Sequence, residues 1–235
     1  MRINKYLASL GIASRRKVDK LIEEGRVRIN SQIAKLGDQI DPEKDKVEVN
    51  SREVKAQKEK FVYIILNKPN GVVSTTAEFP NEKTVLDLVD SNVRLYPVGR
   101  LDKDSTGLIL LTNDGELTNH LTHPKYHSPK TYEVMILGPV TDEKLNILRN
   151  GIELEDGKTA PAEVSVISKT NHHTWLRVVL KEGKKRQIRR MTSALHLHIE
   201  DLKRVSIGPI SIGNLGLGKF RNLRKDEVEK LKNST

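Results

Sequence analysis

The sequence predicts an α+β protein in which a small N-terminal module is joined by a linker to a larger domain with a mixed, mostly antiparallel sheet. Two observations support this class. Apolar residues recur with helical and strand periods along the chain, and a polar run at residues 51–60 separates two segments of different pattern. We therefore expect an N-terminal module at residues 1–50, a linker at 51–60 and the larger domain at 61–235.

The N-terminal module has the pattern of two short helices followed by strands. Apolar residues at helical spacing predict a first helix near the N-terminus, and Ser14 is placed to cap a second helix that stops at Gly25. Residues 26–30 alternate as a half-buried strand does, and residues 47–49 predict another short strand.

The larger domain alternates strand runs with single helices, an order that favours an α+β fold over a parallel α/β fold. The expected strands are residues 61–66, 108–112, 131–137, 162–168, 174–180 and 205–212. The expected helices are residues 84–89, 116–122, 142–149 and 186–197.

The composition limits the classes of protein to consider. The 41 Lys and Arg residues against 31 Asp and Glu give a net charge of +10, which favours a polyanionic partner, although the total alone fits a merely basic soluble protein equally well. The chain has no cysteine, which excludes disulfides and thiolate-metal sites. No apolar run reaches membrane-spanning length, so we expect a cytoplasmic protein with no membrane partner.

Much of the positive charge lies in the first 28 residues. Three of these cations occupy the first turn of the predicted second helix, where the helix dipole disfavours them and a bound phosphate would reverse the balance. The alternative is a solvated face of a helix pair. The candidate contacts to a polyanion in this segment are Arg2, Lys5, Arg15, Arg16, Lys17, Arg26 and Arg28.

A second charged segment, GRLDKDSTGLILLTNDG at residues 99–115, places acids on a tight loop before an apolar strand. Buried or half-buried charges need partners. The residues alone favour a structural loop held by a pair between Arg100 and Asp102 or Asp104 over a catalytic carboxylate.

A third segment, LKEGKKRQIRRM at residues 180–191, holds six basic residues and one acid and leads into a predicted helix. The seven histidines of the chain show no metal-binding spacing backed by carboxylates, so we expect no metal. We expect phosphate contacts from this segment, with surface ion pairs as the alternative, at Lys185, Arg186 and Arg190.

The stretch GIASRRKVDKLIEEGRVRIN, with the apolar helix before it, resembles the S-four RNA-binding domain, which is named after a small-subunit ribosomal protein. In that family two short helices and a hairpin present a basic face to structured RNA. The resemblance covers about the first fifth of the chain and implies RNA binding without chemistry.

The run G-R-L-D, followed by Ser105, Gly107, four aliphatic residues and Thr112-Asn113, resembles the signature of the RsuA/RluB family of ribosomal RNA pseudouridine synthases. The resemblance covers essentially the whole chain and implies a pseudouridine synthase domain after the S-four module. It implies that Asp102 is the nucleophile and leaves Asp104 a structural role. It further implies a tyrosine that stacks on the target uracil, an arginine beside the nucleophile and a substrate pocket, which we assign to Tyr132, to Arg189, and to Arg100, Leu101 and Ile188.

The reaction implied by this resemblance converts one uridine of ribosomal RNA to pseudouridine without any cofactor. The segment IELEDG favours the large-subunit branch; a small-subunit enzyme and a non-catalytic ribosome assembly factor remain alternatives. The substrate is ribosomal RNA or a precursor particle, and we expect a monomer. The residues leave open which uridine reacts, how the two domains are oriented, and whether Asp102 attacks uracil C6 or acts through a glycal.

Overall fold

The computed structural model describes residues 1–54, 60–77 and 79–234. The chain forms two compact units, each described by itself below. One comprises Met1–Val62 with Asn92–Arg94 and Asn113–Gly115, and the other comprises the remainder.

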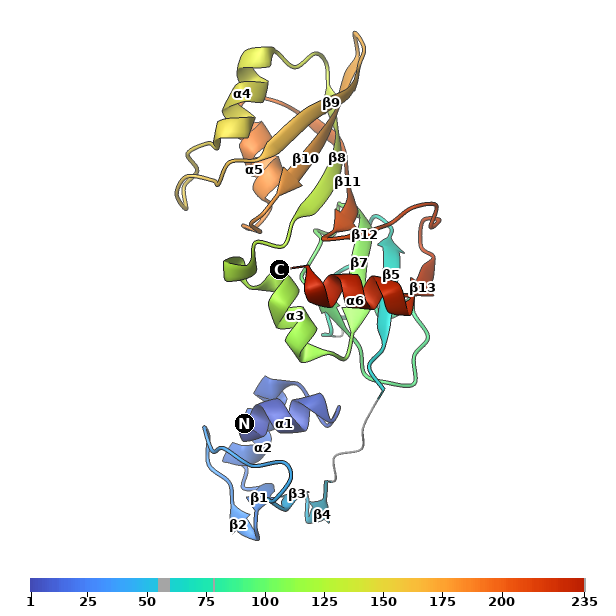
Figure 1. Cartoon of the computed structure of the whole chain (residues 1–235). Helices are drawn as coiled ribbons and strands as arrows, with labels where there is room; N and C mark the ends of the chain where they lie inside the picture. Colours follow the sequence, from blue (N-terminus) through green and yellow to red (C-terminus); the bar gives the residue numbers. More distant parts are fainter. Residues whose placement is uncertain (55–59, 78, 235) are drawn as a thin grey trace. The chain divides into compact units, whose positions relative to one another are not determined.

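The first unit packs two helices on a small antiparallel sheet with the strand order β2-β1-β3-β4 (Figure 1). Ser14 caps the second helix as predicted, because its hydroxyl accepts a hydrogen bond from the Lys17 amide at 3.3 Å. The elements are α1 Ile3–Ser9, α2 Arg15–Glu23, β1 Val27–Ile29, β2 Gln32–Ile33, β3 Val47–Val49 and β4 Arg52–Glu53.

The predicted linker at residues 51–60 differs in part from the structure. Arg52 and Glu53 form the edge strand β4 on β3, so the beginning of the polar run belongs to the sheet. Residues 55–59, which make up most of the rest of the predicted linker, lie outside the described residues. Polar composition suggested a linker there because both residues of this edge strand are exposed.

The second unit is built on one nine-stranded mixed sheet with the order β13-β5-β7-β11-β8-β10-β9, in which β6 also pairs with β7 and β12 with β11. The β7–β11 ladder is parallel and the other ladders described in this sheet are antiparallel. Its strands are β5 Tyr63–Lys68, β6 Tyr96–Val98, β7 Thr106–Thr112, β8 Lys130–Leu137, β9 Glu163–Lys169, β10 His173–Leu180, β11 Ile199–Ile207, β12 Ile210–Ser211 and β13 Phe220–Asn222.

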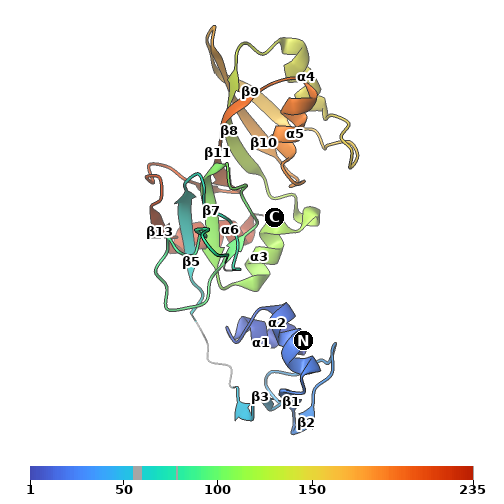
Figure 2. The same cartoon turned by 180° about the vertical axis from the view of Figure 1, so that it is seen from behind.

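Helices cover the two halves of this sheet separately. The helices α4 and α5 lie against β8, β9 and β10, whereas α3 and α6 lie beside β5 and β7 (Figures 1 and 2). Each half has its own apolar core, one around Val134 and Leu176 and the other around Ile65 and Leu108. The helical elements are α3 Gly115–Thr122, the 3₁₀ turn Pro124–Tyr126, α4 Asp142–Asn150, α5 Gln187–Ala194 and α6 Lys225–Asn233.

The α+β class and the mostly antiparallel sheet agree with the prediction, but three expected elements differ. Residues 84–89 are not a helix, because the Asp87 carboxylate accepts hydrogen bonds from the Thr84 amide at 2.7 Å and hydroxyl at 3.0 Å and closes a turn. The expected strand at 205–212 is divided between β11 and β12 by a turn at Gly208. The expected helix at 186–197 begins one residue later and ends at Ala194.

The parallel ladder between β7 and β11 requires a glycine. Gly107 lies opposite Arg204 and has φ +105°, and a Cβ built on it would lie within 2.2 to 2.9 Å of the Arg204 backbone. Only a residue without a side chain allows the two strands to approach this closely.

Gly107→Ala should therefore destabilise the second unit by roughly 2–5 kcal/mol, since it combines backbone strain with a clash against main-chain atoms. Gly138 is the matched control because its φ of +79° carries the same kind of strain, while a Cβ added there would meet nothing within 4 Å. Urea unfolding of both alanine variants measures the difference, and equal losses of stability would contradict the steric explanation.

Candidate active site

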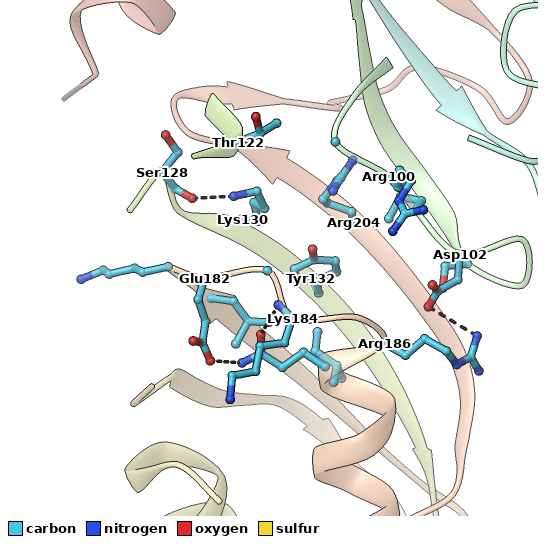
Figure 3. A pocket seen from close by; sticks show the side chains of 18 of the residues that line it. Arg100, Asp102, Thr122, Ser128, Lys130, Tyr132, Glu182, Lys184, Arg186 and Arg204 are labelled. Carbon is cyan, nitrogen blue, oxygen red and sulfur yellow. Dashed lines mark hydrogen bonds and ion pairs between the residues drawn. The ribbon is translucent and has the colours of Figure 1, made fainter. Parts of the chain in front are cut away.

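A cavity of about 360 Å³ opens on the second unit. Its wall comes from the loop before β7, the end of α3, strands β8 and β11, and the loop that leads into α5 (Figure 3). This volume suits one nucleotide-sized group. The two charged segments of the larger domain, residues 99–115 and 180–191, therefore both contribute to the wall of this cavity.

The register between β8 and β11 determines which side chains form the floor of the cavity. Tyr132 on β8 lies directly opposite Arg204 on β11, so the two side chains share one face of the sheet. Lys130 is two residues before Tyr132 on the same strand and points to the same face. All three line the cavity.

The loop that carries Asp102 is fixed by hydrogen bonds to its backbone on both sides of the residue. The Ser74 hydroxyl bonds to the Leu101 carbonyl at 3.0 Å and to the Leu101 amide at 3.2 Å. The Lys103 carbonyl accepts from the Gly71 amide at 2.9 Å and from Lys68 Nζ at 3.3 Å. The backbone on both sides of Asp102 is therefore held by contacts within the protein.

Lys68 itself is fully buried beneath this loop. Burial lowers the pKa of its ammonium group to about 8, even though the charges of Asp104 and Asp102 act in the opposite direction. Sequence patterns did not indicate a role for this lysine, because a Lys-Pro-Asn-Gly stretch indicates only a turn.

Two arginines from the start of α5 reach the Asp102 carboxylate. Arg186 Nη1 lies 3.5 Å from Asp102 Oδ2 and Arg189 Nε lies 3.9 Å from the same oxygen. Arg189 Nε is buried and makes no hydrogen bond within the described part of the chain. The predicted arginine beside Asp102 is thus joined by a second one, Arg186, for which the sequence predicted a phosphate contact.

Asp104 also pairs with the two arginines that contact Asp102. Its carboxylate takes two hydrogen bonds from Arg186, each at 3.2 Å, and lies 3.4 Å from Arg189 Nη2. Partial burial favours the neutral acid, but the Arg186 hydrogen bonds and the Arg189 charge outweigh it and lower the pKa of Asp104. The alternative in which Arg100 pairs with Asp102 or Asp104 is not found among the ion pairs of the described residues.

The backbone of Arg186 is left-handed, with φ +50° and ψ +37°. This conformation is costly for a residue with a long side chain and occurs mostly where surrounding contacts impose it. The imposing contacts are the bonds to Asp104 and the start of α5 directly after Arg186.

The other predicted site residues divide into two groups. Leu101, Ile188 and Arg100 line the cavity as expected. Arg190 instead forms a bidentate pair with Asp156 at 2.8 and 3.1 Å, which favours the surface ion pair over a phosphate contact. Lys185 is exposed, and its phosphate contact stays a prediction.

Lys184 and Arg204 line the cavity but were not predicted. Lys184 Nζ donates to three successive carbonyls, those of Asp156 at 3.2 Å, Gly157 at 2.8 Å and Lys158 at 3.2 Å. It therefore ties the loop after α4 to the loop before α5. Neither residue differs in the sequence from its basic neighbours, and only the fold separates their roles.

In the first unit all seven predicted RNA contacts are exposed. Arg26 is held by Glu24 at 2.9 Å and by the Asn50 side chain at 2.7 Å. In contrast, the described residues offer no ion-pair partner to Arg15, Arg16 or Lys17 at the start of α2. Within the described residues no group of three or more acids, histidines or cysteines is arranged to hold a metal, and no helix is long and apolar enough to cross a membrane.

Comparison with known proteins identifies the class of both units. A family model described as RNA pseudouridylate synthase matches residues 62–194, and an S4 domain model matches residues 1–47. The chain therefore belongs to the RNA pseudouridine synthase family, the isomerases that convert uridine in RNA to pseudouridine, and it carries an S4 domain in its N-terminal unit.

Relatives that match over nearly their whole length show which members of the family this chain is similar to. The chain is 42% identical to an uncharacterized RNA pseudouridine synthase of Aquifex aeolicus, over 98% of this chain and 93% of the relative. It is 40% identical to ribosomal large subunit pseudouridine synthase B of Bacillus subtilis, over 98% and 95%. A crystal structure of a pseudouridylate synthase superposes with a TM-score of 0.71 at 32% identity, over 98% of this chain and 99% of that one. The resemblance to the RsuA/RluB family and the predicted α+β fold are confirmed.

Asp104→Asn should lower the free energy of unfolding at pH 7 by no more than about 1 kcal/mol, since both Asp104 and Arg186 are more than 40% exposed and solvent screens the pair. The pKa of Asp104 is lowered in the folded protein, so its contribution is present above the ordinary value and is lost as pH falls through the folded one. The gap between Asp104→Asn and wild type should therefore be constant above about pH 5 and should narrow as pH falls below the ordinary value of 3.8. Urea unfolding across this range tests it, with Asp90→Asn at an exposed carboxylate as the control. A gap independent of pH would contradict the assigned cause.

Proposed function

We propose that this chain isomerises a specific uridine to pseudouridine in ribosomal RNA of the large subunit, with Asp102 as nucleophile. The observation that carries the proposal is the Asp102 carboxylate at the wall of the cavity, fixed by its loop and flanked by two arginines at 3.5 and 3.9 Å. Guanidinium groups at these distances attract and orient the carboxylate, which is the group that can act covalently.

Tyr132 is the second proposed catalytic residue. Its ring lies on the cavity floor, where it can stack on a uracil, and its hydroxyl makes no hydrogen bond to any of the described residues. A phenolic oxygen left without a protein partner is available to take the proton that leaves uracil C5.

The reaction balances without an imported group. The bond between uracil N1 and ribose C1′ breaks, the base turns, and C5 bonds to C1′. One proton leaves C5 and one is gained at N1, so neither oxidant nor cofactor is required. We assign to Arg186 and Arg189 the task of orienting the Asp102 carboxylate. We assign to Leu101 and Ile188 the apolar wall that keeps water from the reacting base.

The large-subunit assignment is supported by the likeness over nearly the whole chain to the Bacillus subtilis synthase named for that subunit. A small-subunit substrate is the nearest alternative. The complete set of carboxylate, tyrosine and arginines around one cavity argues against a non-catalytic assembly factor. We further propose that the protein acts as a cytoplasmic monomer on free rRNA or on an assembling particle.

We also propose that the S4 domain provides a second RNA contact through the exposed cations at the start of α2. A helix N-terminus and three cations without ion-pair partners among the described residues form a suitable phosphate site. Two linked contacts raise the effective concentration of one domain at its site once the other is bound.

Asp102→Asn should abolish pseudouridine formation while RNA binding changes less than about threefold, because the amide keeps the shape but not the nucleophilic charge. Chemical mapping of pseudouridine across all rRNA with wild type, Asp102→Asn and the control Asp90→Asn measures this and also identifies the nucleotide. Normal activity of Asp102→Asn would refute the nucleophile, and a modified nucleotide in small-subunit rRNA would refute the subunit.

Replacing both Arg15 and Arg16 by Gln should weaken RNA binding and flatten its salt dependence by about 0.7–0.9 for each phosphate that the variant no longer neutralises. The paired control replaces Lys35 and Lys44, two exposed lysines of the same unit, by Gln. Binding titrations at several salt concentrations measure the slopes. Equal slopes for the two double variants would contradict a specific contact at α2.

A further inference from the structure

The inner end of the cavity holds a buried guanidinium group without a counterion. Arg204 is 2% exposed, and its Nε donates a hydrogen bond to the Leu108 carbonyl at 2.8 Å. Its Nη2 atom is buried and has no hydrogen-bond partner, and no carboxylate of the described residues pairs with it. An arginine cannot become neutral in a protein. The positive charge of Arg204 is therefore buried without a negative partner among the described residues, which costs free energy.

A second cation lies beside it. Lys130 projects from β8 on the same face as Tyr132, which is directly opposite Arg204. Its Nζ donates to the Ser128 carbonyl at 3.0 Å, and the described residues give it no ion-pair partner. Burial, and then the nearby charge of Arg204, lower the pKa of Lys130 to about 8. Two like charges are therefore held together where each already costs free energy.

The two acids that line the same cavity, Asp102 and Glu182, form no ion pair with these cations. Asp102 is engaged by Arg186 and Arg189. Glu182 accepts hydrogen bonds from the Ala160 amide and from the Gln187 side chain. In Figure 3 the Glu182 carboxylate points away from Lys130, and the Asp102 carboxylate is turned towards Arg186. The cavity thus contains one carboxylate, Asp102, that is paired with arginines, and two cations, Lys130 and Arg204, that have no ion-pair partner among the described residues.

We propose that Lys130 and Arg204 form an anion subsite that binds a phosphate group flanking the target uridine, across the Tyr132 ring from Asp102. A full negative charge is required here, because the neutral carbonyl groups of uracil would leave the two charges uncompensated. The identification of the anion as an RNA phosphate rests on the proposed function; the existence of the subsite does not.

The first test uses inorganic phosphate as the probe and requires no RNA. Phosphate should raise the Tm of a protein in which Arg15 and Arg16 are replaced by Gln, which lacks the phosphate site proposed at α2, above its value in chloride of equal ionic strength. Adding Lys130→Met to this background should remove most of the response. Without phosphate, Lys130→Met should melt about 2–4 °C higher than wild type, because a repelled and desolvated charge has been removed. A lysine with a purely structural role would give the opposite sign.

Lys203→Met is the matched control. Lys203 neighbours Arg204 on β11, and strand alternation places its side chain on the opposite face of the sheet. In the same background it should keep the response to phosphate. Arg204→Lys, which retains a cation in place of a guanidinium that the fold needs, should keep part of the response. Equal phosphate responses of Lys130→Met and Lys203→Met would overturn the subsite.

The second test uses an RNA fragment that contains the uridine found by mapping, with a neutral methylphosphonate on either side of it. Lys130→Met should bind the natural fragment about tenfold more weakly than wild type, with a salt slope lower by about 0.7. One of the two neutral linkages should weaken wild type to the same degree and leave Lys130→Met unchanged. Additive losses would overturn the phosphate assignment. If the wild-type protein modifies no rRNA, the proposed function fails, while the result with inorganic phosphate still decides the subsite.

Discussion

The parallel contact between β7 and β11 is the constraint on which the site depends. The strand β7 contributes Leu108 and Leu110 to one apolar core, whereas β11 contributes Leu202 to the other core and Ile207 to the first. The Asp102 loop leads into β7, while β11 pairs with the strand that carries Tyr132. The proposed nucleophile and the proposed base therefore meet only because these two strands pair, over a ladder of two residue pairs.

This contact also explains the place of Gly107 in the signature. The glycine lies five residues after Asp102 and has no chemistry of its own, yet a side chain there would collide with the backbone of Arg204. The bond from Arg204 Nε to the Leu108 carbonyl ties the same two strands from the side. A residue of the proposed anion subsite thus also holds the two halves of the sheet together.

The sequence predicted some regular elements well, as in α2, where Ser14 was expected to cap the helix, and in α4, expected at residues 142–149. It failed where a local side-chain bond replaced the helix, at Thr84 and Asp87, and where an edge strand is fully polar, at Arg52 and Glu53. The family resemblance indicated Asp102, Tyr132 and Arg189. Arg204 and Lys184 could not be distinguished from other cations, because burial and the partners of a side chain are set by contacts between residues that are remote in sequence.

Lys184 shows what such a contact achieves. Three consecutive carbonyl oxygens converge on one ammonium group, an arrangement that resembles the way loops enclose a dissociable metal ion. Here the cation is covalently attached to the chain, so its effective concentration is constant. The order of this loop therefore requires no dissociable metal ion at this position.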